Sequence, residues 1–331
     1  MRKSVVLLAG VGVGAAAGLL ARRRRARPAS PEPAMGEQVT VTTADGVRLA
    51  VEVDRATDPK AAVVFAHGWV LNRHAWFPQR EALAGQAMLV AYDHRGHGAS
   101  TAGSSDCCTI EQLAEDLEAV IEAVVPAGVP VVLVGHSMGG MTVMGLAARR
   151  PELFGERVRS VVLMSTSCGG MAGNTFGLPG PVGRLVPRLT PLVMERALKQ
   201  AAWIDRRTAV RARTNRPATR YLAFGPGARP QDVKLVNDMI AATPTEVMVG
   251  FFNGILAHDK LSALRALAGV ETHVLVGSHD RLTSPAHARR IAGALPHATL
   301  TVVPSAGHML GLERPDTVNE VLGRLVRAAA R

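Results

Sequence analysis

Residues 131–140 read VVLVGHSMGG, in which a single serine lies among histidine, methionine and glycine after an apolar run. Four branched apolar residues lead up to Gly135, a run that is typical of a strand buried on both faces. The segment MTVMGLAARR (141–150) follows the glycine pair and has the apolar spacing of a helix. Ser137 therefore lies in a sharp turn between a strand and a helix, where Gly135 and Gly139 occupy positions that only small residues fit.

A serine in such a turn is typical of a nucleophile elbow, formed here by Gly135, His136, Ser137 and Gly139. The hydroxyl of Ser137 is expected to project clear of the carboxyl edge of the sheet. The next helix begins beside it, so free backbone amides at the helix N-terminus point at any oxyanion that forms there. We expect the amide of Met138 to be one of these donors.

A serine nucleophile needs a histidine base and an acid that orients the histidine, and after an elbow they follow in the order acid, histidine. The stretch VLVGSHDRLTSP contains Asp280 as its only carboxylate. The stretch VVPSAGHML places His308 between the last apolar run and the last helical pattern. Both follow strand-like runs, so both are expected at the carboxyl edge of the sheet. The sequence AHGW (66–69) offers the amide of Trp69 as the second oxyanion donor.

Apolar runs alternate with helical patterns along most of the chain. The runs occupy 61–68, 87–93, 129–135, 158–165, 272–278 and 298–304, and further helical patterns occupy 110–125, 284–295 and 316–330. Such alternation predicts a doubly wound α/β fold with a mostly parallel sheet. The stretch 38–54 alternates around Asp45-Gly46 and predicts a hairpin. Residues 168–257 lack strand-like runs but contain amphipathic stretches at 193–212 and 232–253, which favours an inserted helical cap.

The stretches FAHGW, YDHRGHGAS, GHSMGG, GSHDRLTSP and AGHML together resemble the α/β-hydrolase superfamily, in particular its lipase- and esterase-like branch with a helical cap. The resemblance extends over residues 38–331. It implies an eight-stranded, mostly parallel sheet, a cap inserted after the sixth strand, and a Ser137–Asp280–His308 triad. The motifs are specific for the fold and the triad but not for the substrate.

These features predict a serine hydrolase that cleaves carboxylic esters or thioesters of apolar substrates through an acyl-enzyme. Leu71, Met138 and Met141 are apolar residues near the serine, and Met171, Phe176 and Leu178 either line the pocket or form the cap's own core. Perhydrolase, peptidase and C–C hydrolase activities use the same triad and remain alternatives, as does a ligand-binding protein without turnover. None of the expected chemistry requires a cofactor or a metal.

Composition excludes several other classes of protein. Of the 331 residues, 47% are hydrophobic and 20% are charged, as in ordinary globular proteins with a large core. The net charge of +11 is concentrated in residues 1–30 and 169–245, and no aromatic-basic pattern of a nucleic-acid binder accompanies it. Cys107, Cys108 and Cys168 lack the spacing of a zinc site, and His94 and His97 in DHRGHG are interpreted as parts of a structural loop.

The N-terminal residues 1–27 have a different character from the rest. Ser4 to Ala21 form 18 residues without a charge, which as a helix would span about 27 Å. The arginines at 22–25 and 27 follow this segment, which favours a membrane anchor with the C-terminal bulk in the cytoplasm. A cleaved signal peptide that directs secretion is the alternative. The proline-containing residues 28–37 are expected to be a linker, and residues 38–331 the catalytic domain.

Overall fold

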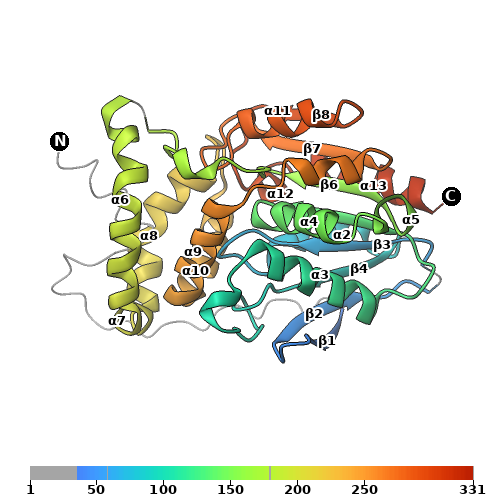
Figure 1. Cartoon of the computed structure of the whole chain (residues 1–331), viewed down its shortest axis with the longest axis horizontal. Coiled ribbons are helices and arrows are strands. Elements are labelled where there is room, and N and C mark those ends of the chain that lie inside the picture. Colours follow the sequence, from blue (N-terminus) through green and yellow to red (C-terminus); the bar gives the residue numbers. More distant parts are fainter. Residues whose placement is uncertain (1–35, 58, 179, 331) are drawn as a thin grey trace.

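The computed structural model describes residues 36–57, 59–178 and 180–330, whose strands form one eight-stranded sheet (Figure 1). The strands are β1 (Glu37–Thr42), β2 (Arg48–Asp54), β3 (Ala62–Ala66), β4 (Met88–Tyr92), β5 (Val131–His136), β6 (Val158–Met164), β7 (Glu271–Gly277) and β8 (Thr299–Val303). Their order is β1-β2-β4-β3-β5-β6-β7-β8, and β2 is antiparallel to both neighbours while β4 to β8 and β3 pair in parallel. The predicted fold class, a mostly parallel eight-stranded sheet with an inserted helical cap, is confirmed, and β1 and β2 form the predicted hairpin.

The continuous apolar runs are explained by burial of both faces of the sheet. Val63 and Phe65 point into one cluster of buried side chains, whereas Val64 and Ala66 point into the other. Helices α3 (Ile110–Val124), α4 (Met138–Arg149) and α11 (Pro285–Ala294) contribute to the cluster around Val64. Helices α2 (Phe77–Leu83) and α13 (Pro315–Ala329) contribute to the cluster around Phe65. Two short helices, α5 (Leu153–Glu156) and α12 (Leu310–Glu313), adjoin this framework.

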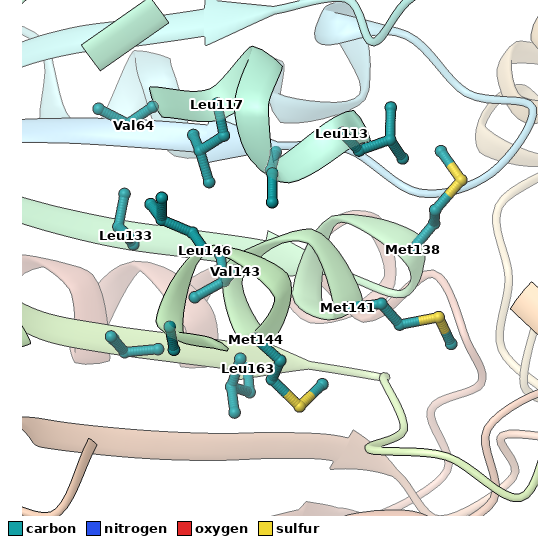
Figure 2. Close-up of a cluster of buried hydrophobic side chains, with 14 of the residues drawn as sticks. Val64, Leu113, Leu117, Leu133, Met138, Met141, Val143, Met144, Leu146 and Leu163 are labelled. Carbon is teal, nitrogen blue, oxygen red and sulfur yellow. The ribbon is translucent and has the colours of Figure 1, made fainter. Parts of the chain in front are cut away.

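Packing of α3 and α4 on the sheet fixes the position of the turn that holds Ser137. Figure 2 shows Leu113 and Leu117 of α3 and Val143 of α4 among the strand side chains of the same cluster. Helix α4 begins at Met138, three residues before the stretch predicted from the sequence. Glycines at 139 and 140 are poor helix formers. Here they lack a Cβ where α4 closely approaches the backbone of Ala66 and the side chain of Thr166.

Helices between β6 and β7 form the cap, which stands at one end of the sheet in Figure 1. They are α6 (Gly180–Lys199), α7 (Ala201–Asp205), α8 (Thr208–Ala223), α9 (Pro230–Ala242) and α10 (Thr245–Ala257). The sequence predicted two amphipathic stretches here. The structure divides them into more helices, and prolines at 187, 191 and 217 lie inside helices rather than ending them.

The predicted membrane anchor at 4–21 lies outside the described residues. Within the part that is described, no single helix is long and apolar enough to cross a bilayer. Helices α9 and α10 reach the length and apolar composition of a membrane span only when they are taken together. The two helices are bent by 101° relative to each other.

Candidate active site

Ser137 lies between β5 and α4 with φ 54° and ψ −116°, a backbone conformation that residues other than glycine rarely adopt. Such a conformation costs about 1–3 kcal/mol and persists only where the surrounding structure enforces it. Here the amide of Ser137 donates to the carbonyl of Met164 at 2.9 Å, and the hydroxyl of Thr166 donates to the carbonyl of Ser137 at 2.7 Å. The strained turn is therefore held from the neighbouring strand β6 and the loop after it.

The glycines around Ser137 are required by close approach of backbone to backbone. A Cβ atom at Gly139 would overlap the carbonyl oxygen of Ala66, at the end of β3. A Cβ atom at Gly135 would lie 2.6 Å from the carbonyl oxygen of Gly139. Both contacts are with backbone atoms, which cannot rotate away as a side chain can. The serine turn is thus pressed directly against the end of β3.

Asp280 and His308 meet in the loops after β7 and β8. The Nδ1 atom of His308 lies 2.9 Å and 3.1 Å from the two carboxylate oxygens of Asp280. The amides of Leu282 and Thr283 donate to Oδ1 of Asp280 at 2.9 and 2.8 Å, and the Thr283 hydroxyl donates to Oδ2 at 3.0 Å. Burial alone would raise the pKa of Asp280, but His308 and these hydrogen bonds hold it below its ordinary value. Asp280 is therefore an ionised acceptor that holds the proton of His308 on Nδ1.

The side chains of Ser137 and His308 line the same cavity, with His308 only 5% exposed and Ser137 9% exposed. Among the described residues, no hydrogen bond joins the Ser137 hydroxyl to the His308 ring. Catalytic hydrogen bonds are often long or poorly aligned before substrate binds. The structure thus joins two of the three predicted residues by hydrogen bonds and brings the third to the same cavity.

His136 connects the serine turn to the histidine loop. Its Nε2 atom donates to the carbonyl of His308 at 2.9 Å, and the two rings are 4.9 Å apart between centroids. Burial, together with the nearby His308 ring, lowers the pKa of His136 to about 3, so the ring stays neutral and can keep its Nε2 proton. His136 was predicted as part of the elbow. Its bond to a residue 172 positions away has no signal in the sequence.

The cavity beside Ser137 has a volume of about 160 Å³ and is lined mostly by apolar side chains. Leu71 and Met141 from the core and Met171, Phe176 and Leu178 from the start of the insertion all line it. Met138, which was predicted to lie near the site, instead has its side chain fully buried in the core. The lining contains no Asp, Glu, Lys or Arg among the described residues, so the cavity favours uncharged, apolar groups.

Two backbone amides are candidates for an oxyanion hole. Within residues 36–57, 59–178 and 180–330, neither the Trp69 amide nor the Met138 amide donates a hydrogen bond to the protein. Both Gly68 and Trp69 line the cavity. The indole of Trp69 donates to the carbonyl of Met248 in α10 at 3.0 Å and lies 5.4 Å from the ring of Phe252. The side chain therefore lines the pocket and also packs against the cap.

The histidines of the DHRGHG loop belong to a buried cluster below the site. His67, His94 and His97 are fully buried, and the ring of His67 lies 4.4 Å from that of His94 and 5.4 Å from that of His97. Burial lowers the pKa of His67 and of His97 to about 3, so the rings are neutral. Across the described part of the chain, no group of three His, Cys, Asp or Glu side chains is arranged to hold a metal ion.

Comparison with known proteins agrees with this geometry. The sequence model of the alpha/beta hydrolase family matches residues 63–321, which is more than half of the chain. The chain belongs to the alpha/beta hydrolase family. This hydrolase spans nearly the whole length of its carbamate hydrolase and esterase relatives and of the solved structures that resemble it.

Two curated relatives illustrate the chemistry found in the family. The protein named "Putative carbamate hydrolase RutD" from Caulobacter vibrioides is 26% identical over 307 residues, covering 88% of this chain and 99% of that protein. The pimeloyl (acyl-carrier protein) methyl ester esterase of Xanthomonas campestris pv. campestris is 25% identical over 269 residues, covering 81% and 95%. A thermophilic esterase from Thermogutta terrifontis has the same fold, with a TM-score of 0.69 and 24% identity over 89% of this chain and all of that one. The relatives support hydrolase activity.

Several residues of the site in this hydrolase were not predicted. Thr283 bonds Asp280 and also lies 3.2 Å from Nδ1 of His308 through its hydroxyl oxygen. Its position three residues after the acid, in DRLT, is a local signal that could have identified it. Thr166 and the cap residue Asn215, by contrast, reach the site only through the fold.

Proposed function

We propose that this alpha/beta hydrolase is a serine hydrolase that cleaves carboxylic esters or thioesters with an apolar acyl or alkyl group. One observation carries the proposal. Ser137, held at a positive φ, shares an apolar cavity with His308, whose other ring nitrogen is bonded to the ionised Asp280. A hydroxyl, an imidazole and a carboxylate in this arrangement support acyl transfer.

The proposed reaction begins when Nε2 of His308 takes the proton of the Ser137 hydroxyl as Oγ attacks the substrate carbonyl. The unused amides of Trp69 and Met138 donate to the oxyanion. The tetrahedral intermediate collapses, and the leaving alcohol or thiol takes the proton from His308. A water activated by His308 then attacks the acyl-enzyme, releases the acid and returns the proton to Ser137. Asp280 stays ionised throughout and keeps the imidazole in the required tautomer.

The walls of the cavity support an apolar substrate. Each methylene removed from water contributes about 0.8 kcal/mol to binding, and the lining of this cavity is almost entirely hydrocarbon. The relatives named as a methyl ester esterase and a carbamate hydrolase both have names that describe cleavage at a carbonyl bearing a heteroatom. That bond type is the one we assign to this chain.

Labelling with a fluorophosphonate probe tests the proposal directly. We expect the wild type to be labelled at Ser137 and Ser137→Ala to remain unlabelled. Ser165 is the matched control, because it also follows a strand, has a positive φ of 47° and is absent from the cavity lining. Ser165→Ala should label like the wild type. The proposal would be refuted if the wild type is not labelled and also does not hydrolyse p-nitrophenyl esters or thioesters of graded acyl length.

Membrane attachment through residues 1–27 is a separate proposal, with residues 28–37 as a linker to the catalytic domain on the cytoplasmic side. It is supported by the uncharged segment 4–21 and the arginines that follow it. Deleting residues 1–27 should move the protein from the membrane fraction to the soluble fraction. If the wild-type protein is exported and its mature N-terminus lacks these residues, the segment is a cleaved signal peptide instead.

A further inference from the structure

Asn215 is an unusual residue in the wall of the cavity. It lies on the cap helix α8, is only 4% exposed, and lines the same space as Ser137. Its Oδ1 atom is buried, and no group of the described residues donates a hydrogen bond to it. Its Nδ2 atom likewise has no acceptor within those residues. A buried amide oxygen without a partner is costly, so such a group in a native structure requires an explanation.

The two cap threonines in the wall are hydrogen-bonded within the protein. The hydroxyl of Thr219, one turn further along α8, donates to Oδ1 of Asn237 at 3.1 Å. The hydroxyl of Thr190 on α6 donates to the carbonyl of Val186 at 2.7 Å. Asn215 differs from these two threonines because it lines the cavity with an amide whose oxygen has no hydrogen-bond donor among the described residues.

Helix α8 is held firmly enough to fix the position of this amide. The buried guanidinium of Arg211, one turn before Asn215, donates through Nη2 to the carbonyls of Ile240 and Thr243, each at 3.1 Å. The side-chain amide of Asn237 donates to the carbonyl of Ala212 on the same helix. These bonds hold α8 on the N-terminal side of Asn215, and the bond from Thr219 to Asn237 of α9 holds it on the C-terminal side. The backbone that carries the Asn215 amide is consequently fixed relative to α9.

We propose that Asn215 selects a substrate whose acyl chain carries a hydroxyl group away from the scissile ester. A hydroxyl can donate to Oδ1 and accept from Nδ2 of one amide. The absence of charged side chains from the described lining argues against a carboxylate or an ammonium group at that point, because neither would find a counter-ion. This inference rests on the proposed function, which places the ester carbonyl at Ser137.

The test compares methyl esters of straight-chain acids with the same esters bearing one hydroxyl at successive positions, with hydrolysis followed by pH-stat. At one position the wild type should prefer the hydroxylated ester at least about tenfold in kcat/KM. Asn215→Leu should lose this preference, by a faster reaction with the plain ester, a slower one with the hydroxylated ester, or both. A merely structural role would change both esters equally. Thr190→Val is the matched control and should keep the preference, because its hydroxyl is already bonded within α6.

A binding measurement separates this inference from the proposed function. In the Ser137→Ala background, calorimetry with the same esters should show tighter binding of the hydroxylated one, and adding Asn215→Leu should abolish the difference. Absence of turnover in the wild type would refute the proposed function, while the binding ratio would still decide the role of Asn215. If Asn215→Leu does not fold, Asn215→Ser, which keeps one hydroxyl, should reduce the preference partially. Equal binding of all the esters to the parent variant would overturn the inference.

Discussion

Asp280 at the edge of the sheet and the side chains of the cap differ in how completely their polar and apolar groups are satisfied. At the edge, Asp280 accepts bonds from two amides, a hydroxyl and an imidazole. In the cap, Leu185, Leu189 and Leu192 of α6 are 46%, 41% and 63% exposed, and Asn215 has no partner among the described residues. The carboxylate of Asp280 is thus held in a fixed geometry, whereas the cap has unused binding capacity.

This contrast suggests different roles for the two regions: the sheet edge positions the proposed reacting groups, and the cap selects the substrate. Backbone contacts and buried hydrogen bonds determine where Ser137 and His308 lie, and chemistry requires such fixed positions. The cap supplies a wall of side chains, and a wall determines which substrates fit rather than what reaction they undergo. Changes at the sheet edge should therefore affect the rate with every substrate, whereas changes in the cap wall should affect substrates selectively.

Removing the proposed nucleophile or base should have the largest effect. We expect Ser137→Ala and His308→Ala each to reduce kcat for ester hydrolysis by about 10⁴ or more, by comparison with other triads. The loss should be the same for every ester that the wild type accepts. A variant that keeps near-normal turnover of any of them would exclude its residue from the chemistry. Ser165→Ala, at a similar backbone conformation outside the cavity, should retain activity.

Mild acid should destabilise the protein through the buried histidines of the core, since every histidine lies outside residues 180–257. Burial lowers the pKa of His67, His97 and His136 to about 3. Below about pH 6.5 the unfolded chain binds protons at these rings and the folded chain does not, so stability falls as the pH falls from about 6.5 toward 3. Each ring contributes up to about 1.4 kcal/mol per pH unit.

Urea unfolding at pH 7.5 and 5.5 measures this loss. His97→Gln should show a shallower dependence on pH, by about one proton, because one of the rings is removed. Equal free energies of unfolding at the two pH values would contradict the prediction.

Adding a methyl group beside Ser137 should destabilise the protein substantially. Gly139→Ala places a Cβ against the backbone oxygen of Ala66, and we expect it to lower the free energy of unfolding by about 3 kcal/mol or to prevent folding. Gly293→Ala is the control, because Gly293 lies in α11 and a Cβ added there would meet nothing within 4 Å. It should stabilise by about 0.5–1 kcal/mol. Similar changes in melting temperature for the two variants would show that the turn is not tightly packed.

Most of the sheet and the proposed catalytic residues could be predicted from sequence because their signals are local. Continuous apolar runs mark strands buried on both faces, and glycines beside Ser137 mark the turn. The family resemblance supplied the number of strands. Helix α2 (Phe77–Leu83) was not predicted, since it is short and Pro78 and the polar residues after it obscure its pattern.

The rest of the site could not be predicted because it depends on contacts between distant segments. His136 bonds a carbonyl 172 residues away, and Trp69 bonds one 179 residues away. Whether Met171, Phe176 and Leu178 line the pocket or fill the cap was open from sequence, since hydrophobicity is the same in both cases. The lack of a partner for Asn215 is a property of its surroundings in three dimensions, which the asparagine itself does not reveal.

The smallest effect is expected on the outer face of the cap. Leu192 is 63% exposed, so Leu192→Ala should change the free energy of unfolding by less than about 0.5 kcal/mol. Met194, two residues further along α6, is 7% exposed, and Met194→Ala should cost about 2 kcal/mol or more. Urea titration of the two variants measures both. A large loss at Leu192 would mean that this face is covered in solution.

The bond from His136 to the carbonyl of His308 has a consequence for how the fold tolerates change. The proposed nucleophile and base are linked by a very short route: Ser137 is covalently joined to His136, and one hydrogen bond leads from there to His308. Displacements caused by an insertion in a remote loop or by a shift of an outer helix need not accumulate along the intervening 170-odd residues. Outer loops and helices can therefore be lengthened, shortened or substituted while the spacing between Ser137 and His308 is preserved.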